Sequence, residues 1–281
     1  MSFSVQVVDL HSHSQASDGL LSPAEVVARA AARGVDMLAL TDHDETSGLS
    51  PARAAAESTR LRFIDGVEIS AEWGSIQVHV VGLDIDAHDA TLNAELKIIR
   101  SGRIERARRM AAELEASGIP ECFAGAVRHA DNPNLINRSH FARYLVEIGI
   151  CRDVRSVFDS YLVPGKPGYV NHQWAKLGEA IDWIHGAGGI AVLAHPGRYK
   201  LSRLEMRALL DEFKSLGGQA IEVIFGNQMP EHFVEFARLA REYEFLGSCG
   251  SDFHGPKESY VDLGANAPLP DGITPVWTAF R

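Results

Sequence analysis

Residues 5–19, VQVVDLHSHSQASDG, place an apolar run directly before two histidines and an aspartate. The apolar run predicts a buried strand. His11 and His13 stand two positions apart, so on extended chain their side chains point to the same side. Asp18 follows in the predicted loop. The two histidines of an isolated HxH are more often surface or core residues than metal ligands, but at this spacing two imidazoles can also chelate one metal ion.

The chain beyond this stretch alternates strand and helix signals. Residues 22–34 predict a helix, because Ser22 is an N-cap, Glu25 completes a capping box and Gly34 ends the pattern. The same patterns predict further helices over 50–60, 176–189, 204–218 and 231–243, and strands over 5–10, 35–40, 62–69, 75–83, 190–195, 220–225 and 245–252. This order is typical of βαβ units in a parallel sheet, open or closed, and we favour a barrel.

Residues 90–170 interrupt the alternation. Helical patterns cover 92–118, 138–149 and 154–162, with little strand signal between them. The segment holds 12 Lys and Arg against 9 Asp and Glu, a net charge of +3, which leaves −13 on the rest of the chain. We therefore expect a metal-binding barrel from residues 1–89 and 171–281, with 90–170 inserted as a helical cap that binds substrate.

Composition and charge exclude several classes of protein. The formal net charge of −10 argues against nucleic-acid binding through a broadly basic surface. No apolar run approaches the roughly 18 residues that span a bilayer, and the amino terminus has no signal-like segment. We expect a cytoplasmic protein without a membrane partner, and the sequence indicates no obligate protein partner.

Potential metal ligands recur at the predicted strand ends and in the first loop. They are six histidines and three carboxylates: His11, His13, Asp18, His43, Glu68, His79, His195, Asp252 and His254. The carboxyl ends of the strands in a parallel barrel meet on one face, so these side chains should converge. Nine ligands exceed the needs of one ion and suggest two or three. Mixed imidazole and carboxylate ligation suits Mn, Fe or Zn better than Ca or Mg.

Seven short motifs occur along the chain in the order HSH, SDG, TDHD, GVEIS, VHVVG, AHP and GSDFH. In this order they resemble the polymerase and histidinol phosphatase (PHP) family over residues 5–85 and 171–260. The resemblance implies a distorted seven-stranded (β/α) barrel of the TIM type with a trinuclear metal site. It also implies that the nine residues are its metal ligands. By the same resemblance, the catalytic groups would be His195 and a hydroxide that bridges the metals.

Clustered divalent ions favour phosphate ester hydrolysis. Amidohydrolase barrels also carry an early HxH, but they use a carboxylated lysine as a bridging ligand. No lysine stands at a predicted strand end here, and Glu68 takes that position. We therefore rank a phosphate ester above an amide as the substrate.

The cap supplies candidate phosphate ligands. Arg100 and Arg103 begin a stripe of arginines at every third position, with Ser101 and Gly102 between them, although such faces are usually only solvated. Asn137 can cap a helix that starts at Arg138. The amino terminus of that helix is either an anion site or an ordinary capped end with a surface arginine. Lys166 and Arg198 lie where cap and barrel should meet, and they are weaker candidates.

Two anion sites outside the metal cluster would fit a substrate with a second phosphate. The order of cap and barrel most resembles the PHP branch that dephosphorylates nucleoside 3′,5′-bisphosphates, such as 3′-phosphoadenosine 5′-phosphate, and trims short RNA from the 5′ end. We expect that activity with two or three divalent ions, Mn preferred and Fe or Zn as alternatives. A histidinol-phosphate phosphatase and a noncatalytic nucleotide-binding module stay open as alternatives.

Overall fold

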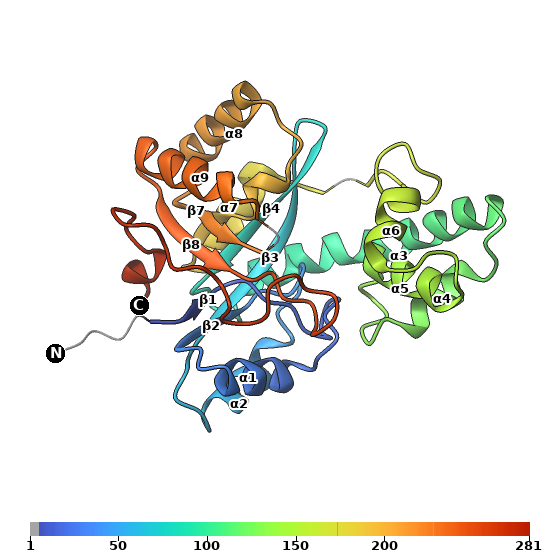
Figure 1. Cartoon of the computed structure of the whole chain (residues 1–281), viewed down its shortest axis with the longest axis horizontal. Coiled ribbons are helices and arrows are strands. Elements are labelled where there is room, and N and C mark those ends of the chain that lie inside the picture. Colours follow the sequence, from blue (N-terminus) through green and yellow to red (C-terminus); the bar gives the residue numbers. More distant parts are fainter. Residues whose placement is uncertain (1–5, 173, 227) are drawn as a thin grey trace.

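The computed structural model describes residues 6–172, 174–226 and 228–281, so Val5 of the predicted first strand lies outside the described residues. The described residues form one eight-stranded curved sheet, in which seven strands follow the order β1-β2-β3-β4-β6-β7-β8. They are β1 (Val8–Asp9), β2 (Met37–Leu40), β3 (Arg62–Trp73), β4 (Ile76–Leu83), β6 (Ile190–Leu193), β7 (Ala220–Phe225) and β8 (Leu246–Gly250). Figure 1 shows these strands gathered in one half of the molecule.

The sheet closes between its first and last strands. Leu10 donates its backbone N–H to the carbonyl of Cys249 at 2.9 Å, and Asp252 donates to the carbonyl of His11 at 2.9 Å. A parallel bridge between Ser12 and Phe253 continues the pairing beyond the strands. These bonds confirm the predicted distorted barrel.

One strand differs from the expected parallel arrangement. β4 runs antiparallel to both β3 and β6, whereas the other neighbours along the sheet are parallel. Only two residues separate β3 from β4, and a connection that short can join only antiparallel strands. Gly74 in this turn has a φ of +59°, which favours glycine. The physical reason for the distortion is therefore this tight hairpin.

Helices cover the outside of the barrel. They are α1 (Pro23–Ala32), α2 (Leu49–Ala56), α7 (Leu177–Gly186), α8 (Arg203–Ser215) and α9 (Pro230–Glu242). α1 begins with the predicted capping box, in which Ser22 and Glu25 bond reciprocally to each other's backbone N–H groups. An N-cap of this kind stabilises a protein by about 1 kcal/mol. The helices pack their apolar faces against the strands in one hydrophobic core.

The inserted segment between β4 and α7 is mainly helical, as predicted. It contains α3 (Ala90–Ala116), α4 (Cys122–Arg128), α5 (Arg138–Glu147), α6 (Val154–Val157) and a π-helical turn (Phe158–Leu162). These helices lie beside the barrel in Figure 1 and share a second hydrophobic cluster of their own. The patterns did not predict α4 or the two-residue strand β5 (Ala175–Lys176), which pairs with β3.

Two short 3₁₀ turns, Pro196–Arg198 and Val276–Ala279, complete the architecture. No helix within the described ranges has the length and apolar character needed to cross a bilayer.

Candidate metal centre and anion site

The structure brings all nine predicted ligands together at one mouth of the barrel. Most follow the carboxyl end of a strand, as expected, but two lie inside the β3–β4 hairpin. Glu68 is in the middle of β3, and His79 is the fourth of the eight residues of β4. Because β4 runs antiparallel, its amino-terminal half reaches the mouth where the parallel strands end. The expectation that these ligands follow the carboxyl ends of strands is therefore wrong for these two.

The innermost group holds both histidines of the HxH pair. Nε2 of His11 and Nε2 of His13 are 3.1 Å apart. Oε2 of Glu68 is 3.3 Å from each of these nitrogens. Oδ1 of Asp252 is 3.3 Å from the His11 nitrogen and 3.1 Å from the His13 nitrogen. Two nitrogens and two oxygens thus converge on one point, which suits a divalent ion.

Glu68 also connects the inner group to a second one. Its Oε2 is 2.9 Å from Nδ1 of His43, while its Oε1 is 2.7 Å from Nδ1 of His79. Nε2 of His195 is 3.0 Å from the same Oε1. One fully buried carboxylate therefore faces five of the predicted ligands, His11, His13, His43, His79 and His195, as a bridging ligand must.

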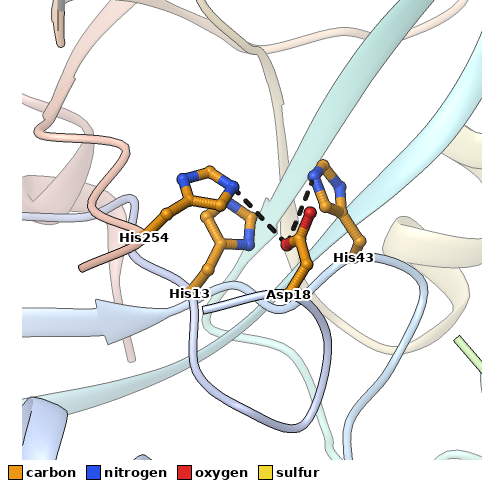
Figure 2. Close-up of side chains that lie close together, drawn as sticks. All are labelled: His13, Asp18, His43 and His254. Atoms are coloured by element: carbon orange, nitrogen blue, oxygen red, sulfur yellow. Dashed lines mark ion pairs between the residues drawn. The ribbon is translucent and has the colours of Figure 1, made fainter. Parts of the chain in front are cut away.

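A third group surrounds Asp18, as Figure 2 shows. Oδ1 of Asp18 is 3.5 Å from Nε2 of His254 and 4.0 Å from Nε2 of His43. His13 completes this group and belongs to the inner one as well. The three overlapping groups fit two or three ions.

Buried atoms without partners test whether the residues fit a metal. Oδ1 of Asp18, Nδ1 of His13 and Nδ1 of His195 are buried and accept or donate no hydrogen bond within the described chain. Leaving a buried polar group unpaired costs about 1–3 kcal/mol. Three such atoms within one cluster of ligand-type side chains indicate that cations belong there.

The electrostatics of the cluster support the same conclusion. Burial opposes the charged form of Asp18 and of Glu68, but the surrounding histidines hold the pKa of both carboxyls well below the usual range. Burial also opposes a charged His13, yet hydrogen bonds to Asp252 and Glu68 raise its pKa to about 10. The carboxylates thus stay ionised and draw positive charge. Divalent ions would supply that charge and leave the imidazoles neutral.

His195 is held differently. Burial lowers its pKa to about 4, so the imidazole is neutral at physiological pH and able to ligate a metal. Its backbone has a φ of +28°, a conformation that residues other than glycine rarely adopt. Such strain persists only where the surrounding structure enforces it.

A cavity of about 630 Å³ opens from the ligands toward the inserted helices. Four of the predicted substrate residues line it: Arg103, Asn137, Arg138 and Arg198. The other four, Arg100, Ser101, Gly102 and Lys166, are not among its lining residues. Nη1 of Arg100 instead donates to the Asp44 carbonyl at 2.5 Å.

Two of the lining arginines are occupied by carboxylates. Arg103 forms an ion pair with the buried Asp44 and donates to Oδ1 of Asn137 at 2.5 Å. Arg198 pairs with Asp252 and donates to the carbonyl of Gly226 at 2.9 Å. These guanidinium groups are fixed in place, and their charge is largely compensated.

Arg106 and Arg138 face the cavity without such compensation. Nε of Arg106 donates to the carbonyl of Val170 at 3.1 Å, and its guanidinium lies over the Trp174 ring. Arg138 reaches only the carbonyl of Leu162, at 3.5 Å, and lies over the Phe158 ring. No carboxylate of the described residues lies within ion-pair distance of either arginine. Burial and then neighbouring guanidinium groups lower the pKa of Arg106, so an anion here would be favourable.

Arg106 belongs to the arginine stripe but is not among the predicted substrate residues, because spacing alone does not tell which turn of α3 faces the cavity. Glu222 was not singled out at all. The signal was present: it is the one charged residue in the apolar run AIEVIF, residues 220–225.

A family model for the PHP domain matches residues 9–248. The chain belongs to the PHP domain family. It is 52% identical, over 96% of its length and 95% of the relative, to a protein from Chromobacterium violaceum named 3′,5′-nucleoside bisphosphate phosphatase. It is 42% identical to a Haemophilus influenzae protein named 5′-3′ exoribonuclease, over 97% of this chain and 98% of that one.

A solved structure from Chromobacterium violaceum superposes with a TM-score of 0.94 at 52% identity, covering 96% of this chain and 94% of that one. It is described as an amidohydrolase with bound sulfate and no metal. The resemblance to the PHP family and the barrel fold are therefore confirmed.

Proposed function

We propose that this protein is a metal-dependent phosphoesterase that removes the 3′-phosphate of nucleoside 3′,5′-bisphosphates. One observation carries the proposal: the ligand cluster and the uncompensated arginines, Arg106 and Arg138, line the same cavity. A substrate with two phosphates can place one at each site. The relative named 3′,5′-nucleoside bisphosphate phosphatase supports this choice.

The nine ligand residues would hold two or three divalent ions, with Mn preferred and Fe or Zn as alternatives. When bound, such ions lower the pKa of water and stabilise the attacking and leaving oxygens of a displacement. Glu68 bridges the groups, and neutral His195 stands beside its Oε1. Hydrolysis adds water across the P–O bond and gives inorganic phosphate and a nucleoside 5′-monophosphate.

Arg106 and Arg138 would bind the phosphate that is not hydrolysed. A guanidinium group can donate two parallel hydrogen bonds to phosphate oxygens. Arg138 is the first residue of α5, so the free backbone N–H groups of that helix add to the attraction. On this basis residues 90–170 act as a substrate-binding cap on a barrel formed by 1–89 and 171–281.

An amide substrate is less well supported. The residues that line the cavity include no lysine, and Glu68 occupies the centre of the ligand cluster instead. Short RNA is a second candidate, because a relative is named 5′-3′ exoribonuclease. The first nucleotide of 5′-phosphorylated RNA has phosphate groups on its 5′ and 3′ oxygens, as a nucleoside 3′,5′-bisphosphate does.

The decisive experiment measures phosphate release by Mn-loaded protein from 3′-phosphoadenosine 5′-phosphate, adenosine 3′-monophosphate and histidinol phosphate, and nucleotide release from short 5′-phosphorylated RNA. We expect fast release from the bisphosphate and a much higher KM for the monophosphate, which lacks the group that the arginines bind. Nucleotide products from RNA would show the second activity.

His13→Ala should abolish release because His13 belongs to two of the ligand groups. His129→Ala is the matched control, since His129 pairs with Glu147 away from the cavity. Activity on histidinol phosphate alone would overturn the substrate assignment. Nucleotide binding without any hydrolysis would indicate the noncatalytic module.

A further inference from the structure

Glu222 is a buried carboxylate that none of the predicted ligand groups includes. It lies on β7, all six residues of which are buried, and its relative exposure is 1%. Placing an ionised carboxylate in such a strand is unfavourable unless each oxygen finds a partner. The two partners of Glu222 are both predicted metal ligands.

Each oxygen of Glu222 contacts a different ligand. Oε1 is 2.7 Å from Nδ1 of His11, which follows β1. Oε2 accepts a hydrogen bond from the backbone N–H of His195, which follows β6, at 2.5 Å. One side chain on β7 thus ties together the ends of two other strands.

The contact with His11 determines which ring nitrogen can face a metal. A carboxylate only accepts hydrogen bonds, so Nδ1 of His11 must carry the proton. This leaves Nε2 to point at the inner group, where it lies 3.3 Å from both Glu68 and Asp252. A carboxylate behind a ligating imidazole commonly fixes its orientation in this way.

The contact with His195 acts on the backbone. His195 has a φ of +28° and a ψ of 56°, so it requires an anchor to stay in this conformation. Glu222 accepts its N–H and thereby helps to hold the ring with Nε2 3.0 Å from Oε1 of Glu68. His11 and His195 face different oxygens of Glu68, so Glu222 connects two metal positions.

We propose that Glu222 is a positioning residue that holds His11 and His195 together in the geometry that binds two neighbouring metal ions. The inference rests on the metal-dependent function proposed above. It adds a residue that contacts neither the metals nor the substrate but decides how well the metals are held.

Glu222→Gln separates this role from simple packing, because glutamine has nearly the same volume. If the amide oxygen accepts from His195, the amide NH₂ must donate to Nδ1 of His11, and the proton then moves to Nε2. If the amide is reversed, its NH₂ opposes the His195 N–H. The first arrangement blocks the metal-binding nitrogen of His11, and the second removes the acceptor that anchors His195. Glu222→Asp keeps the charge but is too short to reach both partners.

The experiment titrates metal-free protein with Mn²⁺ and counts free Mn²⁺ by electron paramagnetic resonance. We expect Glu222→Gln to weaken Mn²⁺ binding by about 10-fold to 100-fold. Glu222→Asp should retain part of the affinity. The thermal midpoint of the metal-free variants should stay within a few degrees of wild type. The matched control is Glu72→Gln on β3, whose carboxylate pairs with Lys176, and it should bind Mn²⁺ like wild type.

Wild-type affinity and stoichiometry in Glu222→Gln would overturn the inference while leaving the metal-dependent function intact. A wild-type protein that binds none of Mn²⁺, Fe²⁺ and Zn²⁺ would overturn both. Nitrogen-15 NMR of zinc-loaded wild-type protein gives a test that needs no folded Glu222 variant. The His11 ring, assigned by its loss in His11→Gln, should carry its proton on Nδ1. A protonated Nε2 there would overturn the inference.

Discussion

The hydroxyl of Ser139, on the first turn of α5, donates a hydrogen bond to Oδ2 of Asp18 at 2.5 Å. Asp18 belongs to the third ligand group, shown in Figure 2, which we call the outer group. Arg143, one turn further along α5, donates to the backbone carbonyl of Asp18 at 2.6 Å and pairs with Glu258 of the barrel. A helix of the inserted segment therefore holds a predicted metal ligand in place.

Removing the hydroxyl should loosen that ligand. We expect Ser139→Ala to weaken Mn²⁺ binding at the outer group by about tenfold, because hydrogen bonds to ligands typically contribute that much to metal affinity. Titration of metal-free protein with Mn²⁺ measures the change. Ser117→Ala, whose hydroxyl bonds only to the end of α3, is the control. Equal affinity in Ser139→Ala and wild type would contradict the prediction.

Arg106→Met should raise the KM for a nucleoside 3′,5′-bisphosphate by at least tenfold with a smaller change in kcat. A charged hydrogen bond to phosphate contributes about 1.5–3 kcal/mol, and this arginine has no carboxylate that already uses its charge. Steady-state kinetics checks the split between the two constants. Arg109→Met, on the next turn of α3, should behave like wild type because Arg109 only donates to the carbonyl of Asn171. A large fall in kcat at constant KM would assign Arg106 to the reacting phosphate instead.

His140 should make the protein sensitive to mild acid. Burial lowers its pKa from 6.5 to about 4, and its Nδ1 accepts a hydrogen bond from the backbone of Asn137. His140 therefore binds a proton near pH 6.5 in the unfolded chain but only near pH 4 in the folded chain. The free energy of unfolding accordingly falls as the pH drops from about 6.5 toward 4. The slope is about 1.4 kcal/mol per pH unit, or about 2 kcal/mol by pH 5.

Urea unfolding of metal-free wild type and His140→Gln at pH 7 and pH 5 tests this effect. Glutamine can make the same helix-capping bond without titrating. The loss of stability between the two pH values should be smaller in the variant by about 2 kcal/mol. The exposed His88→Gln gives the background. Parallel losses in wild type and His140→Gln would refute the prediction.

Gly250 should tolerate no side chain. A Cβ built at this last residue of β8 would lie 2.3 Å from Cβ of His11 and 2.8 Å from its backbone nitrogen. Gly250→Ala must therefore displace His11, and we expect a loss of about 1–3 kcal/mol in unfolding free energy together with weak Mn²⁺ binding. Thermal or urea unfolding and metal titration measure both. Gly186→Ala in α7, where no atom lies within 4 Å, should be neutral or stabilising.

The ligand cluster was predictable because each of its residues sits in a short local pattern. His11 and His13 follow an apolar strand, and His195 follows another, so the barrel rule places them together without any knowledge of side-chain positions. His79 was predicted correctly as a member of the cluster although its strand runs the other way. The metal role of all nine residues stays a prediction that the experiments above address.

The anion site was harder to predict because it depends on which face of a helix meets the barrel. A helix turns by about 100° per residue, so Arg100, Arg103 and Arg106 point in different directions despite their regular spacing. Only the packing of α3 shows that Asp44 occupies Arg103 and leaves Arg106 free for an anion. Glu222 was missed because its partner His11 follows β1, the first strand, which comes near β7 only when the barrel closes.

α3 spans both hydrophobic clusters, with Leu92 and Leu96 in the barrel core and Met110 and Leu114 in the core of the inserted helices. Residues that recognise the alcohol portion of a phosphate ester can therefore change around one core while the catalytic centre is maintained by the other. Such a division of labour offers an evolutionary route to new substrates. A redesigned insertion that keeps the contacts of Ser139 and Arg143 with Asp18 could redirect the enzyme to another phosphate ester and leave the chemistry of bond cleavage as it is.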